Sequence, residues 1–425
     1  MVQTYLPRVY DSVLRHLLGS TGAVLVEGAK WCGKTTTAEQ VACSAVYFQD
    51  PRTRDQNELL ARIDPSRLLD GDAPRLLDEW QVVPQLWDAI RFEVDHRGED
   101  GQFIITGSSV PANLDEVKHS GTGRIARMIM RPMALAESGD SNAGVSLEAL
   151  FARGTCEVTA AADDGIDSLA HLVCRGGWPR AVGRDEESAL QQAYNYLDAV
   201  CEVDISRVDG VKRDAHKTRA LLRSYARMIS SEGSLASMRV DMSEGGSELG
   251  ESAFLGYVAV LRKLFVLDDL RAWSPNLRSK TAIRTTPTRH FVDPSIAAAA
   301  LGAGPGDLVG DLNTFGLVFE DMCVRDLRAY AAPLMGDVFH YRDKTGLECD
   351  AVVHLRNGSF GLVEVKLGGK ELIEEGARNL LTLAAKIDTD KMRQPSFLMV
   401  LVGVGAYSYP REDGVLVVPL RALGA

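Results

Sequence analysis

The sequence predicts an α/β fold with additional domains, and three observations support this. A short apolar run at residues 23–27 leads into a glycine-rich loop and then a helical pattern. Strand-like and helical segments keep alternating up to residue 135, as in a parallel sheet. Helical spacing then takes over, and a second α/β pattern begins at residue 307. A chain of 425 residues is long enough for about three domains.

Composition excludes several classes of protein. Hydrophobic residues make up 45% and charged residues 25% of the chain, which is ordinary for a globular protein. No apolar run approaches the length of a membrane span, and the start lacks a signal-peptide pattern, so we expect a cytoplasmic protein with no membrane partner. Seven scattered cysteines favour reduced thiols over a disulfide framework or a zinc site.

Charge is distributed unevenly along the chain. The formal net charge is −11, which argues against a protein that coats nucleic acid with its whole surface. Residues 205–292 nevertheless hold 15 Lys and Arg against 9 Asp and Glu. This segment is suited to phosphate contacts, and a solvated basic face without a ligand is an equal alternative.

The glycine-rich loop fits the eight-residue phosphate-binding pattern that begins with Gly28 and ends with Gly-Lys-Thr at Thr35. In such a loop, backbone N–H groups surround the β- and γ-phosphates, Lys34 supplies a positive charge, and the Thr35 hydroxyl can bind Mg²⁺. A strand before it and a helix after it make a chance glycine turn the weaker reading. We therefore predict an ATP and Mg²⁺ site. Its expected nucleotide-binding residues are Gly28, Ala29, Lys30, Trp31, Cys32, Gly33, Lys34, Thr35 and Thr36.

A second part of the same site follows two later strands. The apolar run that starts at Arg75 ends in Asp78 and Glu79, as in a Walker B element. Asp78 is expected to hold the Mg²⁺ water shell, and Glu79 to orient or deprotonate the attacking water. Thr106 and Ser108 follow the strand at 102–106 and are expected near the γ-phosphate, although a Gly-Ser turn chosen for its backbone is an equal alternative.

Two arginines, Arg124 and Arg127, lie in a glycine-containing segment that we read as a loop before a strand at 130–132. Either is a candidate finger on a phosphate, in cis or across the subunit interface of a homo-oligomer. A surface loop without such a role explains them equally well.

Four motifs occur along the chain in the order Gly28–Thr35, Leu77–Trp80, Thr106–Ser109 and Gly121–Arg127. In this order they resemble the motifs of a bacterial and archaeal group of predicted AAA+-superfamily ATPases near the STAND-like branch. The resemblance implies a five-stranded parallel core, a helical lid, a winged-helix segment and a C-terminal nuclease-like domain. Gly176-Gly-Trp-Pro179 also resembles the Gly-x-Pro element that STAND-like ATPases place near the adenine, which makes Pro179 a candidate nucleotide contact. A loop stiffened by packing of Trp178 is the plain alternative.

A winged helix is expected from three helical patterns, at 218–229, 235–240 and 251–264, followed by strand-like segments. Arg278, Lys280 and Arg284 would lie in its wing. Such a domain binds DNA or serves as an internal packing module, and the sequence favours neither.

The last segment contains a second group of chemically active residues. Glu364 and Lys366 lie two apart on one strand and so face the same side, while Asp350 lies on the strand before and Glu320 on an apolar helix. This set suits a Mg²⁺-dependent phosphodiesterase: Asp350 and Glu364 bind metal, Lys366 positions hydroxide and Glu320 reaches in. The spacing resembles the PD-(D/E)xK nuclease superfamily, although no proline precedes Asp350.

We therefore predict an ATPase that couples its nucleotide state to a C-terminal Mg²⁺-dependent nuclease-like domain acting on DNA. The alternative is a regulatory, STAND-like ATPase whose last domain only binds nucleic acid or a protein partner. The predicted domains are the ATPase core at 1–135, the lid at 136–210, the winged helix at 211–300 and the nuclease-like domain at 307–425.

Overall fold

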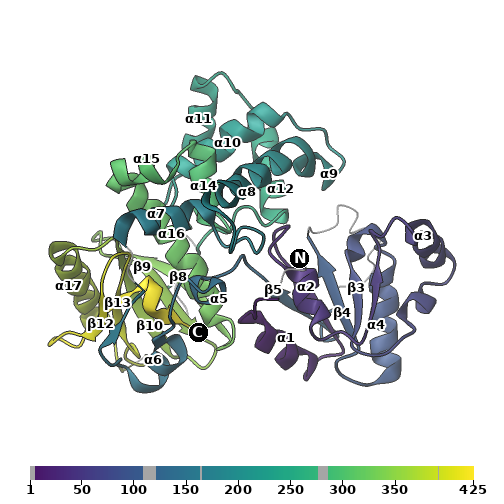
Figure 1. The fold of residues 1–425 in the computed structure, drawn as a ribbon, viewed down its shortest axis with the longest axis horizontal. Helices are drawn as coiled ribbons and strands as arrows, with labels where there is room; N and C mark the ends of the chain where they lie inside the picture. The colour runs from purple at the N-terminus through teal and green to yellow at the C-terminus, as the bar shows by residue number, and fades with distance from the viewer. Residues whose placement is uncertain (1–4, 109–120, 163–164, 276–285, 391) are drawn as a thin grey trace. The chain divides into compact units, whose positions relative to one another are not determined.

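The computed structural model describes residues 5–108, 121–162, 165–275, 286–390 and 392–425, and the chain forms two compact units (Figure 1). The first unit comprises Met1–Pro132, Glu202–Arg213 and Leu255–Val266. The second unit comprises Met133–Cys201, Asp214–Phe254 and Leu267–Ala425. Across the described residues, no helix combines the length and the apolar character that crossing a membrane requires.

The first unit is built on a five-stranded sheet in the order β2-β3-β4-β1-β5, with every neighbouring pair parallel. This confirms the predicted parallel core. Because β4 lies between β1 and β3, the loops that follow these three strands meet at one edge of the sheet. The strands are β1 (Ala23–Glu27), β2 (Ser44–Tyr47), β3 (Arg75–Asp78), β4 (Phe103–Gly107) and β5 (Ile125–Ile129).

Both faces of this sheet are covered by helices. All positions of β1 and β4 are buried, as expected for central strands of a parallel sheet. On one face, Leu25 and Ile105 pack with Trp87 and Ile90 of the helix that follows β3. The helices of this unit are α1 (Tyr10–Leu18), α2 (Lys34–Glu39), α3 (Arg54–Ile63), α4 (Leu86–Arg97) and α9 (Ile205–Arg207).

The structure differs from the sequence expectation around Arg127. We expected a loop there and a strand at 130–132, whereas β5 spans Ile125–Ile129 and includes Arg127. The polar residues of β5 fit its place as an edge strand, where only one neighbour and partial burial are required.

The second unit contains a group of helices that precedes a mixed sheet (Figure 1). The three helices expected for a winged helix are present, and isolated bridges pair Leu267 with Phe291 and Leu270 with Thr288 after them. Arg278, Lys280 and Arg284 lie outside the described residues. The helices are α5 (Leu135–Ser138), α6 (Leu147–Arg153), α7 (Gly165–Arg175), α8 (Glu186–Ala199), α10 (Ala215–Arg227), α11 (Leu235–Glu244), α12 (Glu251–Lys263, which runs into the first unit), α14 (Pro294–Leu301), α15 (Pro305–Gly310), α16 (Leu312–Ala331) and α17 (Lys370–Lys386).

The sheet of the second unit has the order β7-β12-β13-β11-β10-β9-β8. Strands β8, β9 and β10 are antiparallel, and α17 connects β10 to the parallel strand β11. Along the chain, the order of elements is therefore α16-β8-β9-β10-α17-β11. The strands are β8 (Gly336–Arg342), β9 (Glu348–Leu355), β10 (Phe360–Lys366), β11 (Leu398–Val402), β12 (Tyr407–Pro410) and β13 (Leu416–Pro419).

Two short strands tie the segment that we expected to be a purely helical lid to the end of the chain. Strand β7 (Thr159–Ala160) pairs with β12, and β6 (Val145–Ser146) pairs with β14 (Leu423–Gly424). Each has only two residues, which is too short to leave a strand pattern in the sequence. Residues 133–201 accordingly belong to the same compact unit as the C-terminal sheet.

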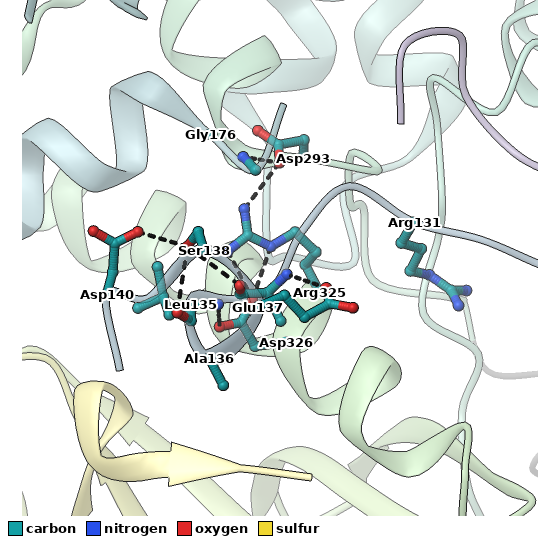
Figure 2. Close-up of polar contacts among 12 residues, drawn as sticks. Arg131, Leu135, Ala136, Glu137, Ser138, Asp140, Gly176, Asp293, Arg325 and Asp326 are labelled. Carbon is teal, nitrogen blue, oxygen red and sulfur yellow. Dashed lines mark hydrogen bonds and ion pairs between the residues drawn. The ribbon is translucent and has the colours of Figure 1, made fainter. Parts of the chain in front are cut away.

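A buried ionic network holds this segment to α16 (Figure 2). The Arg325 guanidinium contacts Asp293 at 2.9 Å and Asp326 at 2.7 Å, and all three side chains are buried. Asp326 also accepts a hydrogen bond from the backbone N–H of Leu135 at 3.0 Å. Because the two carboxylates share one cation and further backbone donors, their charges are compensated inside the unit.

Candidate nucleotide and metal sites

The loop between β1 and α2 has the backbone geometry of an anion-binding loop. Trp31 and Gly33 have φ values of +66° and +102°, and such left-handed residues turn successive N–H groups inward. A Cβ atom on Gly28 would lie 2.1 Å from the carbonyl oxygen of Met130, so only glycine fits there. The Lys34 Nζ atom donates to the carbonyls of Gly28 at 2.9 Å and Ala29 at 2.8 Å. Lys34 thus lies across the loop that the sequence predicts to hold phosphate.

Arg8 supports this loop from outside it. Its buried guanidinium donates to the Cys32 carbonyl at 2.7 Å and to the Arg131 carbonyl at 2.8 Å. Tyr5 Oη donates to Asp11 and lies 3.2 Å from Thr37 Oγ1 on α2. Sequence reasoning missed Arg8, because its partners lie 24 and 123 residues away and no local motif marks it.

The predicted magnesium-binding side chains come together at the edge of the sheet. Thr35 Oγ1 and Thr106 Oγ1 each donate to Asp78 Oδ1 at 2.7 Å. Hydroxyl and carboxylate oxygens are suitable donors for Mg²⁺, which usually takes one or two protein carboxylates and completes its shell with water and phosphate. Thr35 and Asp78 therefore fit a nucleotide-bound Mg²⁺. The Thr106 hydroxyl contacts Asp78, and its expected place near the γ-phosphate remains a prediction.

Glu79 is held in one orientation next to Asp78. Its backbone is left-handed with φ +59°, and its N–H donates to Thr106 Oγ1 at 3.1 Å. The carboxylate accepts hydrogen bonds from Ser108 Oγ at 3.0 Å and from Gln81 Nε2. The structure thus brings Ser108 to Glu79, and it adds Gln81, for which the sequence carried no signal.

The other residues of the predicted loop have different surroundings. Lys30 Nζ forms an ion pair at 2.5 Å with Asp204, which ends a π-helical turn (Val200–Asp204) before α9. Trp31 and Thr36 are exposed, and Cys32 is buried. A π-helical turn is frequent at functional positions.

The structure separates the two candidate finger arginines from each other. Arg124 comes before β5, at the edge of the sheet where the parallel strands begin, and pairs with Asp95 at 2.8 Å. The P-loop follows the opposite end of β1, so Arg124 is not brought to it within this chain. Arg127 pairs with Glu27 at 3.3 Å, directly before the loop. A finger role for Arg124 remains a prediction that requires a second copy of the chain.

Pro179 belongs to the second unit, in a turn fixed by its neighbours. The Gly177 N–H donates to Asp293 at 2.9 Å, and Trp178 Nε1 donates to Ser295 Oγ at 2.9 Å. Trp178 is buried and stacks on Tyr196 with ring centroids 4.3 Å apart. These contacts account for the packing of Trp178, and the adenine contact of Pro179 remains a prediction.

The second predicted site gathers residues of α16, β9 and β10. Ala351 pairs with Val363 across the two strands, which places Asp350 opposite Glu364. Lys366 Nζ contacts Glu364 Oε2 at 3.0 Å, and Asp350 accepts from the Val365 N–H at 2.7 Å. The Glu364 side chain is 2% exposed and that of Lys366 18%, so the group is sheltered but open to solvent.

Electrostatics couple these four residues. Burial, with Asp350 adding to it and Lys366 opposing it, raises the pKa of Glu364 to about 8. Burial and the charge of Asp350 raise the pKa of Glu320 well above its ordinary value. Burial also raises the pKa of Asp350, against the effects of Lys366 and the Val365 N–H. When neighbouring carboxyl groups are costly to ionise at the same time, a bound cation stabilises their charged forms.

The fit of this group to Mg²⁺ depends on how many protein ligands the ion takes. Within the described ranges, no three or more His, Cys, Asp and Glu side chains are arranged as a metal site. A Mg²⁺ ion bound through two carboxylates and completed by water and phosphate needs no such cage. Asp350 and Glu364 fit that mode, with Lys366 beside them.

Comparison with protein families finds three successive matches along the chain. Residues 20–138 match a family described as an AAA domain. Residues 166–307 match a domain of unknown function, DUF8612, and residues 315–423 match another, DUF4143. The AAA match and the loop geometry both support the sequence prediction of a P-loop nucleotide-binding domain at residues 20–138.

Comparison with individual proteins finds two mycobacterial relatives that match over most of this chain. The uncharacterized proteins Rv2008c of Mycobacterium tuberculosis and Mb2031c of Mycobacterium bovis are each 24% identical over 416 residues, which is 96% of this chain and 82% of theirs. Among solved structures, the Walker-type ATPase PABY2304 of Pyrococcus abyssi matches 70% of this chain and 96% of its own length, with 14% identity and a TM-score of 0.43.

Proposed function

We propose that the protein binds ATP with Mg²⁺ at the P-loop and hydrolyses it, with Asp78 and Glu79 as the acidic residues of the site. The observation that carries this proposal is the convergence of Thr35 and Thr106 on one oxygen of Asp78, at 2.7 Å each. This places a hydroxyl and a carboxylate together directly after the anion-binding loop. Glu79 lies next to them, held by Ser108 and Gln81.

Each residue has a distinct task in this proposal. Lys34 exchanges the carbonyls of Gly28 and Ala29 for phosphate oxygens when nucleotide binds, and the loop N–H groups hold the remaining oxygens. Bound Mg²⁺ supplies positive charge to the phosphates, and Thr35 and Asp78 hold it. Glu79 accepts a hydrogen bond from the attacking water and orients it, while Ser108 keeps the carboxylate in place.

ATP titration of matched variants tests this site. Lys34→Ala is expected to abolish ATP binding, because the buried Lys34 ammonium lies across the loop, whereas Lys30 is paired with Asp204. Lys344→Ala, in the exposed turn between β8 and β9, is the control and is expected to bind ATP like the wild type. Unchanged binding by Lys34→Ala would refute the proposal.

A second candidate activity concerns the C-terminal sheet: Mg²⁺-dependent cleavage of phosphodiester bonds in DNA, controlled by the nucleotide state. The specific observation in its favour is the placement of Asp350 opposite Glu364 on adjacent strands, with Lys366 Nζ 3.0 Å from Glu364 Oε2. The raised pKa values of Glu320, Asp350 and Glu364 agree with this crowding of carboxyl groups. The order α16-β8-β9-β10-α17-β11 presents these residues together. It supports the resemblance of this segment to the PD-(D/E)xK superfamily.

In this second activity, Asp350 and Glu364 would hold Mg²⁺, and the cation would offset the cost of burying their charges, which is the main cause of their raised pKa values. Lys366 keeps its proton, because Asp350 and Glu364 raise its pKa despite the opposing effect of burial. It can therefore orient a hydroxide or stabilise negative charge on the phosphate. Glu320 approaches from α16. The alternative is a regulatory ATPase in which this sheet binds nucleic acid or a protein without cutting.

A cleavage assay separates the nuclease activity from the regulatory alternative. Its substrates are labelled single-stranded, duplex, forked and four-way DNA, and RNA. Wild-type protein with Mg²⁺ or Mn²⁺, with and without ATP, is compared with Asp350→Ala and Lys366→Ala. The control is Asp337→Ala, an exposed acid on β8. The nuclease proposal expects cleavage to be lost in the first two variants and ATP hydrolysis to remain in all. Equal cleavage by all variants would refute the assigned site, and no cleavage by the wild type would favour the regulatory alternative.

A further inference from the structure

A groove of about 640 Å³ opens in the helical part of the second unit, between α10, α11 and the end of α14. Its most prominent lining is a row of three arginines, Arg219, Arg223 and Arg227. They are four residues apart on α10, so they lie on one face of that helix at intervals of about 6 Å. The groove therefore presents a line of positive charges about 12 Å long.

The partners of these arginines leave one cation uncompensated. Arg219 pairs with Asp198 at 2.6 Å, and Arg227 pairs with Asp241 at 3.0 Å. Arg223 is exposed and has no hydrogen-bond or ion-pair partner among the residues that the structure describes. Asp198 and the Arg227 guanidinium are largely exposed, so both ion pairs are of the weak, exchangeable kind.

The remaining lining adds polar donors and little negative charge. Ser224 donates to Asp241 at 3.0 Å, and Ser247 lies 3.3 Å from His216 Nδ1. The end of α14 contributes small residues, among them Gly302. The lining thus contains three arginines and one histidine, and its acidic residue is Asp241. Asp198 is not part of the lining but pairs with Arg219. The sequence from 205 to 292 shares this excess, with 15 Lys and Arg against 9 Asp and Glu, in a chain whose net charge is −11.

We propose that this α10 groove binds the sugar-phosphate backbone of a nucleic acid. Arg223 offers a free guanidinium whose planar donors match phosphate oxygens in pairs, and Arg219 and Arg227 exchange their aspartates for neighbouring phosphates. A row of evenly spaced arginines suits a ligand with regularly repeated charge better than a single small anion. This inference rests on the proposed nucleic-acid role of the second unit, and it adds the contact surface, which lies outside the carboxylate group of β9 and β10.

Fluorescence anisotropy of the full chain with labelled DNA tests this inference in EDTA, so that no cleavage occurs. The variant is Arg223→Ala, and the matched control is Arg153→Ala, an exposed arginine at the end of α6. Loss of one charged hydrogen-bonding contact is expected to weaken binding about tenfold. The slope of log Kd against log salt concentration is expected to fall by about one relative to the control. Arg223→Lys is expected to restore most of the slope, since it keeps the charge.

Two results would overturn the inference. One is an affinity and salt slope for Arg223→Ala that equal those of Arg153→Ala. The other is a wild type that binds polyglutamate in an Arg223-dependent way but does not bind DNA, which would assign the groove to an acidic polypeptide.

The cleavage assay gives a result that is independent of the binding assay. DNA cleavage with Arg223-independent binding rejects the groove and keeps the nuclease, while Arg223-dependent binding without cleavage keeps the groove and rejects the nuclease.

Discussion

Replacing Thr106 by valine is expected to disable ATP hydrolysis while leaving nucleotide binding largely intact. The Thr106 hydroxyl is fully buried, donates to Asp78 Oδ1 at 2.7 Å and accepts the Glu79 N–H at 3.1 Å. Valine has nearly the same shape but no hydroxyl, so the substitution removes both hydrogen bonds and leaves two buried polar groups with fewer partners. Binding through Lys34 and Thr35 involves neither bond.

The size of the effect follows from these contacts. A hydrogen bond to a charged group contributes about 1.5–3 kcal/mol, and about 1.4 kcal/mol corresponds to a tenfold change in rate. If the lost energy falls on the arrangement of Asp78 and Glu79, kcat is expected to fall about 10- to 100-fold with a much smaller change in KM. Phosphate release at varied ATP concentration measures both constants.

Thr106→Ser is the matched control, because it keeps the hydroxyl. It is expected to retain kcat close to that of the wild type. A Thr106→Val protein that folds and hydrolyses ATP at the wild-type rate would show that Thr106 does not position the acidic pair.

Three further predictions concern stability and the loop. Arg325→Met leaves two buried carboxylates without their shared cation, so the free energy of unfolding of the second unit is expected to fall by about 3–5 kcal/mol, measured by urea denaturation. The pKa of Glu364 is raised from its ordinary value near 4.5 to about 8 in the folded chain, so folding favours the protonated carboxyl. The resulting gain in stability is complete below pH 4.5 and is lost as pH rises through 8. In EDTA, the thermal midpoint is therefore expected to fall between pH 5 and pH 8 and to fall less in Glu364→Gln. Gly28→Ala forces a clash with backbone and is expected to lose ATP binding in the titration used for Lys34→Ala.

The sequence was most informative where chemistry is encoded locally. Gly28–Thr35 and Asp78-Glu79 are contiguous motifs after strands, and the order of strands and helices determines that they meet at one edge of the sheet. Asp350 and Glu364 were also accessible to prediction, since alternation along two adjacent strands fixes which side chains share a face.

Features that depend on tertiary contacts were not accessible. Arg8 reaches Cys32 and Arg131, and no periodicity in the sequence links these positions. Strands β6 and β7 have two residues each, and their partners lie near the other end of the chain. Arg124 was considered for the phosphate site because the start of β5 was misplaced. With β5 beginning at Ile125, the parallel register puts Arg124 at the opposite edge of the sheet.

The role of Asp78 and Glu79, at the end of β3, in hydrolysing ATP held by the P-loop is tested by the substitution Glu79→Gln. Binding of ATP and Mg²⁺-dependent release of phosphate are measured side by side for this variant and the wild type. Glu79→Gln is expected to bind ATP as the wild type does and to release phosphate at least about 100-fold more slowly, since the group that orients the water has lost its charge. Phosphate release at the wild-type rate would contradict this role.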